Sequence, residues 1–431
     1  MDYRRKKKFT YFTIGLIFLF SGIEYAVILP TIWKYLQTLG AAPYFLGLGL
    51  SAFSLSGLLS GPLFGHLSDK TGTTKKIILF ANCFEIIGNF MYFMGYSKWL
   101  LLASRLVAGV GTGAGSSIFG FLTRSTAPKD RSSVFAAAMA CRQAGLLIGP
   151  AFNLFLRLCD FHIGPFVVNK YTAPGLFMCL MWILLQLAVV FMYWDLPPLE
   201  REGGPTVRCS PPTHPGARSP FPMATSLAGR WSPPSQRSPS RGSASAEFIT
   251  LFNQTALETM VTPLTQKYFN FGELENSVMY CLCGAEVIAG FLFVHWLSRR
   301  AAERVVLAVG LAVCNVSSVW CLIFLANPMG DYPYQLTEFI IGVFLQVLGL
   351  PFVAVAQVSL FSKVTSEKTQ GFSQGVRRSV GGLATILGPL WAGGLTENMY
   401  IMLGIMMVFS YDRLVQPSAV EHAEENRDEG E

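Results

Sequence analysis

Charged residues are scarce in this chain. Only 14% of its 431 residues are Asp, Glu, Lys or Arg, whereas an average soluble domain contains about 25%. Hydrophobic residues make up 52% of the sequence, and the mean hydropathy is +0.43. The apolar residues fall in long runs separated by short polar stretches. Because a water-soluble core could not enclose so many runs of this length, the composition excludes a soluble domain and predicts a membrane protein.

Motifs of enzymes and of metal sites are also missing. The sequence has no His-Glu-x-x-His motif, phosphate-binding loop or dinucleotide fingerprint. Most of the nine cysteines lie inside apolar runs, and Cys281 and Cys283 are too close together for ordinary metal-ligand spacing. We therefore expect no catalytic activity, cofactor, metal site or disulfide framework. The net charge of +7 belongs mainly to loops, so it indicates membrane orientation and not nucleic-acid binding.

Apolar runs of the length that spans a bilayer recur along the chain. A helix needs about 20 apolar residues to cross the hydrocarbon core. The runs lie near 10–31, 45–65, 77–95, 99–122, 134–156, 173–194, 247–266, 277–297, 304–326, 336–361 and 376–395, with a shorter one near 399–411. This pattern predicts an all-α membrane protein with about 12 transmembrane helices, the last of them short.

Basic residues alternate between the two predicted sides of the membrane. Lys and Arg gather before the first apolar run, in 66–76, in 124–131, in the central polar stretch and in 298–304, while the intervening loops hold few. By the positive-inside rule, both termini and the central stretch are cytosolic. No cleavage site follows the first run, which we interpret as a retained signal anchor.

Two predicted bundles flank a polar linker. Residues 195–246 are rich in Pro, Ser, Gly and Arg, with too few apolar residues to fold, so they predict a disordered cytosolic linker. The linker separates an N-terminal six-helix bundle (1–194) from a C-terminal six-helix bundle (247–414). An acidic cytosolic tail (415–431) follows.

The two bundles carry an internal sequence repeat. The first helix contains "GIEYAVILPTIWKYL" and the seventh contains "ALETMVTPLTQKYF"; each has a Glu (Glu24, Glu258), then a Pro (Pro30, Pro263), then Lys-Tyr. The fifth helix ends in "AGLLIGP" and the eleventh in "ATILGP". Parallel repeats of this kind predict pseudo-two-fold symmetry, and transporters place their binding site at the interface between such repeats.

The loop "GHLSDKTGTTKK", residues 65–76, resembles the signature between helices 2 and 3 of the major facilitator superfamily. Gly65 would permit close helix approach, Asp69 could cap a helix, and Gly72 would allow the turn. We predict a gating role for this loop, with Asp69 at the cytosolic boundary between the bundles, near helix 11. Arg131, in the loop between helices 4 and 5, is its predicted cationic partner.

Two further patterns match the same superfamily. Helix 4 contains "RLVAGVGTGAG", and helix 5 contains "GLLIGPAFN". Small residues on these faces predict tight helix packing in lipid. The predicted packing residues are Gly109, Gly113, Gly145, Gly149 and Pro150.

The transmembrane part also resembles the lysosomal major facilitator proteins of the neuronal ceroid lipofuscinosis group. The resemblance depends on "PLFGHLSD", "ASRLVAGVGTGAG", "GLLIGPAFN", "LETMVTPLTQKY" and "ILGPLWAG". It implies a multi-pass protein of the endosomal or lysosomal membrane that is linked to anion conductance, notably of chloride.

Ionisable residues inside the predicted spans are candidates for the transport pathway, since each costs about 3 kcal/mol to insert without a partner or a wet cavity. By helical rise, Glu24 and Arg105 reach the same depth, so we predict that they pair. Glu85 lies on a predicted outer helix and is interpreted as a snorkelling residue or a hydrogen-bonding residue between helices. The predicted pathway residues are Glu24, Arg105, Arg142, Glu258, Glu286 and Arg378.

The leading functional hypothesis is a carrier that moves a small anionic solute by alternating access, with protons as a possible coupling ion. Arg105, Arg142 and Arg378 would supply positive charge for the anion. The alternatives are an endolysosomal chloride channel on the same fold and a membrane scaffold that transports nothing. The expected partners are the lipid bilayer, the small-molecule or inorganic anion, and protons, with no nucleic acid.

Overall fold

The computed structural model describes residues 2–126, 128–196, 239–297, 300, 303–326, 330–364, 370–396 and 398–415. Within them, fourteen helices and one two-stranded hairpin form. The N-terminal half contains α1 (Tyr3–Val27), α2 (Leu29–Thr38), α3 (Tyr44–Thr71), α4 (Thr74–Met94), α5 (Lys98–Thr112), α6 (Ala114–Ser125), α7 (Pro128–Leu156), β1 (Phe161–Ile163), β2 (Phe166–Val168) and α8 (Ala173–Met192). The C-terminal half contains α9 (Pro239–Phe269), α10 (Glu273–Leu297), α11 (Glu303–Ala326), α12 (Tyr332–Val364), α13 (Gln370–Gly394) and α14 (Met399–Val415).

These helices make two bundles of six segments each. The backbone of Ile28 stays helical between α1 and α2, and that of Gly113 does so between α5 and α6, so each pair counts as one segment. Pro30 has no N–H, which explains why the hydrogen-bond pattern breaks near Ile28. The predicted all-α membrane fold with two six-helix bundles is confirmed. Of the described helical segments, eight are long and apolar enough to span a bilayer by length and composition alone.

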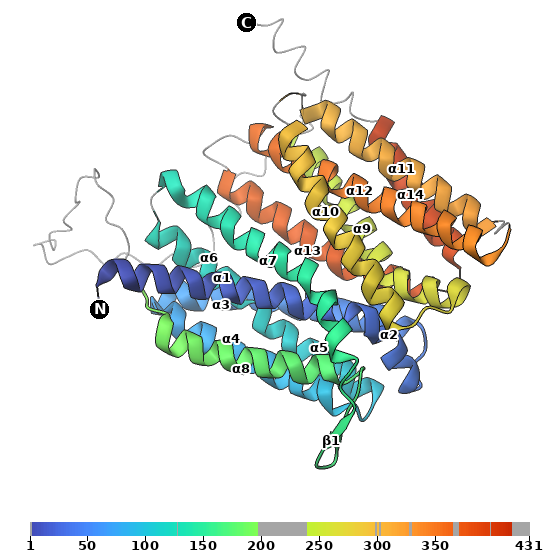
Figure 1. Cartoon of the computed structure of the whole chain (residues 1–431). Coiled ribbons are helices and arrows are strands. Elements are labelled where there is room, and N and C mark those ends of the chain that lie inside the picture. Colours follow the sequence, from blue (N-terminus) through green and yellow to red (C-terminus); the bar gives the residue numbers. More distant parts are fainter. Residues whose placement is uncertain are drawn as a thin grey trace, which may run out of the picture.

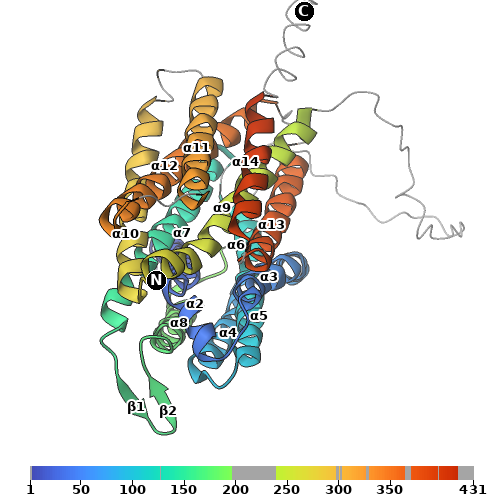
Figure 2. The same cartoon turned by 90° about the vertical axis from the view of Figure 1, so that its right-hand side faces the viewer.

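The bundles lie side by side, the N-terminal one in blue to green and the C-terminal one in yellow to red (Figure 1). They contact each other mainly where α3 packs on α13 and where α7 packs on α10. The hairpin β1–β2 projects outward from the N-terminal bundle (Figure 2), at the end away from the start of α1 (Figure 1). We call this the hairpin end and the opposite one, where α1 begins and α14 stops, the termini end.

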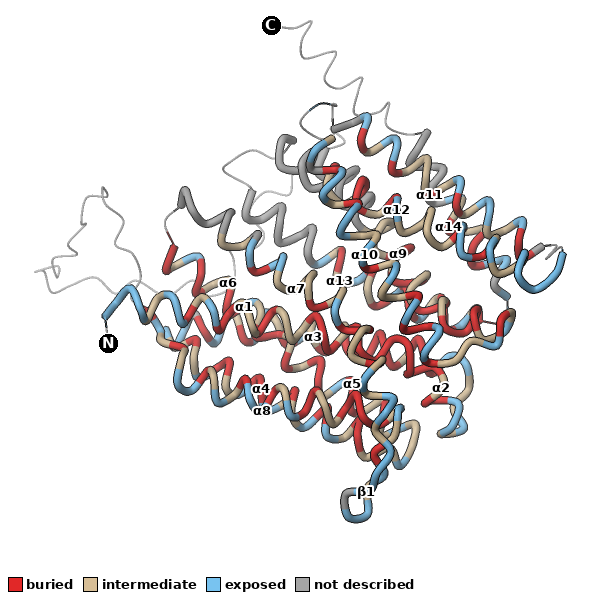
Figure 3. Tube along the Cα trace, viewed as in Figure 1, coloured by how far each residue is buried: buried red, intermediate tan, exposed pale blue. Residues whose placement is uncertain are grey.

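Outer helices present apolar side chains outward, as a lipid-facing surface requires. On α8, Leu180, Leu184, Leu187 and Phe191 are all exposed, and their spacing places them on one helical face. Trp182 is buried on the inner face. Exposed and buried residues alternate in this way along many helices (Figure 3). Because exposed apolar faces of this extent are not tolerated in water, they identify the surface that contacts acyl chains.

Small residues bring α1 and α7 into close contact inside the N-terminal bundle. A Cβ atom on Gly22 would lie 3.0 Å from the Cα of Gly145, and one on Gly145 would overlap the carbonyl oxygen of Leu19. A Cβ on Gly149 would lie 2.7 Å from that of Ala26. Such close approach increases van der Waals contact where no hydrophobic effect drives association.

Gly109 of α5 and Gly113, between α5 and α6, are in equally close contact with α3. A Cβ on Gly109 would overlap the carbonyl oxygen of Phe53, and one on Gly113 would lie 2.8 Å from the backbone carbon of Ser60. A Cβ on Gly65 would lie 3.3 Å from the hydroxyl of Ser116 on α6. Substitution of these glycines would therefore push the helices apart.

Glycine also shapes the contact between the bundles. A Cβ on Gly47 of α3 would overlap the carbonyl oxygen of Pro389 and lie 3.1 Å from the Cα of Gly393, both on α13. The hydroxyl of Ser51 donates a 2.6 Å hydrogen bond to the carbonyl oxygen of Ile386. Around Gly47 the contact between α3 and α13 is thus backbone against backbone, whereas at Gly382 of α13 the side chain of Leu58 on α3 fills the contact.

The signature loop forms a tight turn between α3 and α4. Gly72 ends α3 with φ +65°, and its N–H donates to the carbonyl oxygen of Ser68 at 2.9 Å. This left-handed conformation favours glycine. After α8, both side-chain oxygens of Asp195 accept backbone N–H groups at the start of α4, including that of Thr74 at 3.1 Å. Burial raises the pKa of Asp195 although these N–H donors oppose the shift.

Several boundaries differ from the sequence expectations. Helix α9 begins at Pro239, inside the segment 195–246 that was predicted to be a disordered linker, because the helix extends beyond its apolar part toward the termini end. Residues 197–238 of that linker and the predicted tail from residue 416 lie outside the described residues.

The hairpin β1–β2, by contrast, was not predicted. Its strands pair Ile163 with Phe166, so that Gly164 and Pro165 form a two-residue turn, and Gly164 has φ +59°, as such turns require.

Candidate substrate cavity

A cavity of about 780 Å³ lies between the bundles. Both halves contribute to it, and most of its wall is apolar, with side chains such as Phe18, Phe53, Leu146, Val261 and Phe291. Its volume and apolar character fit a small organic molecule. The charged or hydrogen-bonding side chains in its wall include Tyr25, Asn82, Glu85, Arg142, Gln143, Gln254, Glu258, Tyr280 and Gln346.

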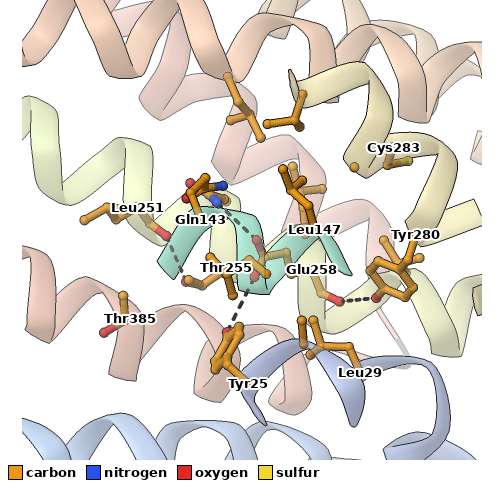
Figure 4. Close-up of a pocket in the computed structure, with 18 of the residues that line it drawn as sticks. Tyr25, Leu29, Gln143, Leu147, Leu251, Thr255, Glu258, Tyr280, Cys283 and Thr385 are labelled. Carbon is orange, nitrogen blue, oxygen red and sulfur yellow. Dashed lines mark hydrogen bonds between the residues drawn. The ribbon is translucent and has the colours of Figure 1, made fainter. Parts of the chain in front are cut away.

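Glu258 of α9 is the centre of a polar group that bridges the two bundles (Figure 4). The hydroxyl of Tyr25, from α1, donates to Glu258 Oε2 at 3.5 Å, and Gln254 Nε2 donates to Oε1 at 3.1 Å. Tyr280 of α10 donates to the backbone carbonyl of Glu258 at 3.1 Å. A carboxylate is therefore held inside the cavity by donors from both halves.

Arg142 of α7 brings a positive charge to the same group. It lines the cavity and lies near enough to Tyr25 and Glu258 to interact with them electrostatically. Thus Arg142 comes from the N-terminal half and Glu258 from the C-terminal half, as the sequence repeat suggested for a site at the interface. We call Tyr25, Arg142, Gln254 and Glu258 the interface cluster.

A second polar cluster lies inside the N-terminal bundle, around Glu24. Glu24 is completely buried. Its Oε1 accepts a 2.7 Å hydrogen bond from Asn89 Nδ2, and its Oε2 accepts a 2.9 Å hydrogen bond from Trp182 Nε1. Arg105 Nη1 lies 3.9 Å from Oε1. Glu24 and Arg105 are therefore at one depth and within ion-pair distance, although neither is in the wall of the cavity.

Arg105 also packs on an aromatic ring. Its guanidinium carbon lies 4.2 Å from the ring centroid of Phe53, a cation–π contact that compensates part of the cost of burial. Only 1% of the Arg105 side chain is exposed. Its Nε and Nη2 have no hydrogen-bond acceptor among the described residues.

Glu85 of α4 completes this second cluster. Its side chain is 1% exposed, it contributes to the cavity wall, and it faces Glu24 and Arg105 electrostatically. No N–H or O–H group among the residues that the structure describes donates to either carboxyl oxygen; the neighbour to which a protonated Glu85 could donate is the Glu24 carboxylate. We call Glu24, Glu85, Asn89, Arg105 and Trp182 the buried cluster.

Comparison with known proteins shows the family to which this fold belongs. The family model described as Major Facilitator Superfamily matches residues 14–324 and, in a second match, residues 243–425. The chain belongs to the Major Facilitator Superfamily. The African clawed frog (Xenopus laevis) major facilitator superfamily domain-containing protein 8 is 22% identical over 480 residues, which cover 95% of this chain and 89% of that protein.

Solved transporter structures share the major facilitator fold with this chain. The human organic anion transporter MFSD10 superposes with a TM-score of 0.62 and 20% identity, covering 96% of this chain and 100% of that one. A D-xylose–proton symporter superposes with a TM-score of 0.70 and 12% identity, covering 96% and 98%. At these identities the likeness shows the fold. The protein is thus a multi-pass membrane protein of the superfamily.

Other predicted site residues lie outside the two clusters. Glu286 of α10 is partly buried and is not in the described cavity wall; its Oε2 has no hydrogen-bond partner among the described residues. The side chains of Asp69, Arg131 and Arg378 are outside the described part of the structure, so the predicted gate stays a prediction. Pro150 of α7 does contribute to the cavity wall.

The bundles of this major facilitator protein also make polar contacts at the hairpin end. Lys170 Nζ lies 3.1 Å from Glu273 Oε2, and Trp33 Nε1 donates to Gln266 Oε1. Gln266 Nε2 in turn donates to Gln37 Oε1 at 3.0 Å. Because each contact joins one half to the other, all three hold the bundles together beyond this side of the cavity.

The ion pair between Lys170 and Glu273 affects the titration of the lysine. Partial burial lowers the pKa of Lys170, but hydrogen bonding and charge attraction by Glu273 outweigh that effect, so the pKa is raised. The ammonium form therefore persists to higher pH than in an isolated lysine.

Sequence reasoning missed several members of the clusters. It identified the charged partners but not Tyr25, Asn89 or Trp182, whose side chains are neutral and common in membrane helices. It interpreted Glu85 as a snorkelling or interhelical hydrogen-bonding residue and did not anticipate that this side chain contributes to the cavity wall. The best available signal was the spacing of Glu85 and Asn89, which places both on one helical face.

Proposed function

We propose that the protein is a carrier that moves a small organic anion across an endosomal or lysosomal membrane by alternating access. The observation that carries this proposal is the interface cluster, in which Arg142 and Glu258 come from opposite halves into one largely apolar cavity. A ligand that contacts both residues contacts both bundles. Its binding can therefore be linked to their relative movement.

The cavity favours an organic solute over a bare inorganic ion. Its apolar wall would leave much of a hydrated ion without hydrogen-bond partners, whereas an apolar carbon skeleton would be buried favourably. The human protein MFSD10, which has the same fold, is described as an organic anion transporter, and this supports the same class of solute here.

Arg142 would bind the acidic group of the solute. An arginine can donate two parallel hydrogen bonds to one carboxylate. Glu258 keeps two donors of its own, Tyr25 and Gln254. When the solute binds Arg142, the Glu258 carboxylate therefore still has two hydrogen-bond donors.

Alternating access would require the polar contacts at the hairpin end to break. The ion pair between Lys170 and Glu273 and the hydrogen bonds of Gln266 join the halves there. If the positive-inside pattern sets the orientation, both termini are cytosolic and the hairpin end faces the lumen. The contacts would then keep the lumenal side closed while the cavity exchanges solute with the cytosol.

Uptake by purified protein in liposomes tests this function. The probe is the fluorescent organic anion fluorescein, and the readouts are saturation and acceleration by unlabelled probe on the opposite side. Arg142→Gln should reduce uptake at least tenfold, while Arg157→Gln, the same change at an exposed position just after α7, should leave it within twofold.

Whole-organelle patch recording of the same variants, under imposed chloride and proton gradients, separates the alternatives. Chloride current without saturable uptake would indicate the channel. Absence of every flux, in protein shown to be folded, would indicate the scaffold. Either result would reject the carrier proposal.

A further inference from the structure

We propose that Glu85 is the proton-binding residue of this protein and that Glu24 and Arg105 hold it ready for proton exchange with the cavity. This inference depends on the proposed carrier function, because it names the ion that would be coupled to the solute. The sequence suggested the pair of Glu24 and Arg105 for such a role. The environments of the two carboxyl groups favour Glu85 instead.

The surroundings of Glu85 suit a neutral carboxylic acid. The group is nearly inaccessible, and among the described residues no donor reaches either of its oxygens. It lies against Gly111 of α5, where a Cβ atom would be 2.6 Å from the carboxyl carbon. An ionised carboxylate only accepts hydrogen bonds, so here it would be buried without a donor to either oxygen. A protonated carboxyl group lacks that cost and can itself donate to an acceptor.

Glu24, by contrast, is surrounded by groups that stabilise its ionised form. Asn89 and Trp182 each donate to one of its oxygens, and Arg105 Nη1 is 3.9 Å away. Hydrogen bonds to a charged acceptor are about twice as strong as those between neutral groups. The two acids of the buried cluster are therefore matched to different protonation states.

The charge of the cluster gives the same assignment. The charged groups that face Glu85 are Glu24 from α1 and Arg105 from α5; α8 contributes the neutral donor Trp182. Two carboxylates beside one guanidinium would leave a net negative charge in a low-dielectric site, which is unfavourable. One proton makes the cluster neutral, and Glu85, which faces Glu24, can donate that proton toward the Glu24 carboxylate.

Glu85 lies closer to the cavity than Glu24 and Arg105 do. Glu85, Asn82 and Trp182 all contribute to the cavity wall, while Glu24 and Arg105 do not. Both Glu85 oxygens are covered in this structure, so proton exchange requires a movement of the cavity wall that uncovers one of them. A hydronium ion can then transfer its proton to that oxygen, forming the O–H bond and leaving water. The reverse transfer to water returns the proton when the cavity opens to the other side.

Helix α1 connects this proton site to the substrate site. Glu24 belongs to the buried cluster, and the next residue, Tyr25, donates to Glu258 in the interface cluster. Neighbouring residues on a helix point about 100° apart, so α1 presents one to each cluster. A change in the charge of the buried cluster would therefore act on the helix that also holds Glu258.

Infrared spectroscopy of the folded protein tests the proton site without any substrate. Protonated carboxyl groups have a distinct C=O stretching band, which difference spectra can assign. Glu85→Gln should remove one component of this band from purified protein at neutral pH. Glu338→Gln, the same substitution on α12 outside the described cavity wall, should not remove that component. Retention of the full band in Glu85→Gln would overturn the assignment.

Transport assays then separate this inference from the carrier proposal. With one coupled proton, a gradient of one pH unit can drive about tenfold accumulation of fluorescein. Glu85→Gln should lose this accumulation but keep exchange of probe for probe, which needs no net proton movement. If Glu85→Gln still accumulates probe in response to pH, the proton site is wrong and the carrier stands. If wild-type protein neither accumulates nor exchanges probe, the carrier proposal itself fails.

Discussion

The pair of Glu24 and Arg105 allows a double-mutant test of how charge is balanced in the buried cluster. In Glu24→Gln, the guanidinium of Arg105 loses the carboxylate 3.9 Å away and keeps its contact with the ring of Phe53. In Arg105→Gln, Glu24 keeps its donors Asn89 and Trp182 but faces Glu85 without a cation between the two acids. Each single variant therefore leaves a buried charge poorly compensated.

Because these charges are buried, the expected loss of folding stability in each variant can be estimated. Removing one partner of a buried ion pair costs about 3–5 kcal/mol. We expect the cost of Arg105→Gln to be at the lower limit, because the two donors to Glu24 remain, each worth about 1.5–3 kcal/mol to a charged group. The double variant removes both charges and leaves only Glu85, which can be neutral. Its cost should fall well below the sum of the single costs, with a coupling energy of about 3 kcal/mol.

Equilibrium unfolding in mixed detergent micelles would measure these costs, with Arg157→Gln as the control for loss of an exposed arginine. Fluorescein uptake by the refolded double variant adds a second readout. If the pair only locks helices together, uptake should return with the fold, whereas a role in proton binding predicts a folded protein that does not accumulate probe. Additive single costs, with no coupling energy, would refute the proposed charge balance.

Three further predictions concern packing, the hairpin end and the linker. Gly145→Ala should destabilise the fold by about 1–3 kcal/mol through overlap with α1, measured by detergent unfolding against Gly115→Ala, where a Cβ meets nothing within 4 Å; equal stability of both variants would contradict this. Lys170→Met should increase cysteine labelling at the hairpin end. Because the pKa of Lys170 is raised, the contribution of its pair with Glu273 should persist at neutral pH. It is lost as the pH rises through that raised pKa, and also at acid pH, where the Glu273 carboxylate becomes protonated. That contribution is about 0.2–1 kcal/mol for a partly exposed pair, and unchanged labelling would argue against a closing contact. Replacement of residues 200–240 by a Gly/Ser linker of similar reach should preserve insertion and uptake, and loss of folded protein would show that this segment packs on the bundles.

Much of the fold could be predicted from the sequence because membrane helices have a strong local signal. A span needs its own long apolar run, so the cores of α4, α8 and α11 were placed nearly at their final bounds. The helix ends were less predictable. The start of α9 at Pro239 lies in a polar stretch, where neither length nor hydropathy marks a boundary.

The clusters were only partly predictable, for a different reason. Depth along a helix follows from residue number, and this brought Glu24 and Arg105 to one level. The direction of a side chain around the helix axis depends on which neighbours each face meets. This direction explains why Glu85 is in the cavity wall and Glu286 is not. It depends on packing between distant parts of the chain, which cannot be inferred from a single sequence.

The contact between α3 and α13 has a consequence for the kinetics of such a carrier. Gly47 meets Pro389 and Gly393 through backbone atoms, and the hydroxyl of Ser51 supplies the hydrogen bond to this stretch of α13. Along this stretch of the interface there are no long interlocking side chains that would have to change rotamer before the helices slide. The activation barrier for tilting one bundle against the other at this interface should therefore be low, so that the slow step of turnover would arise at the polar contacts of the hairpin end.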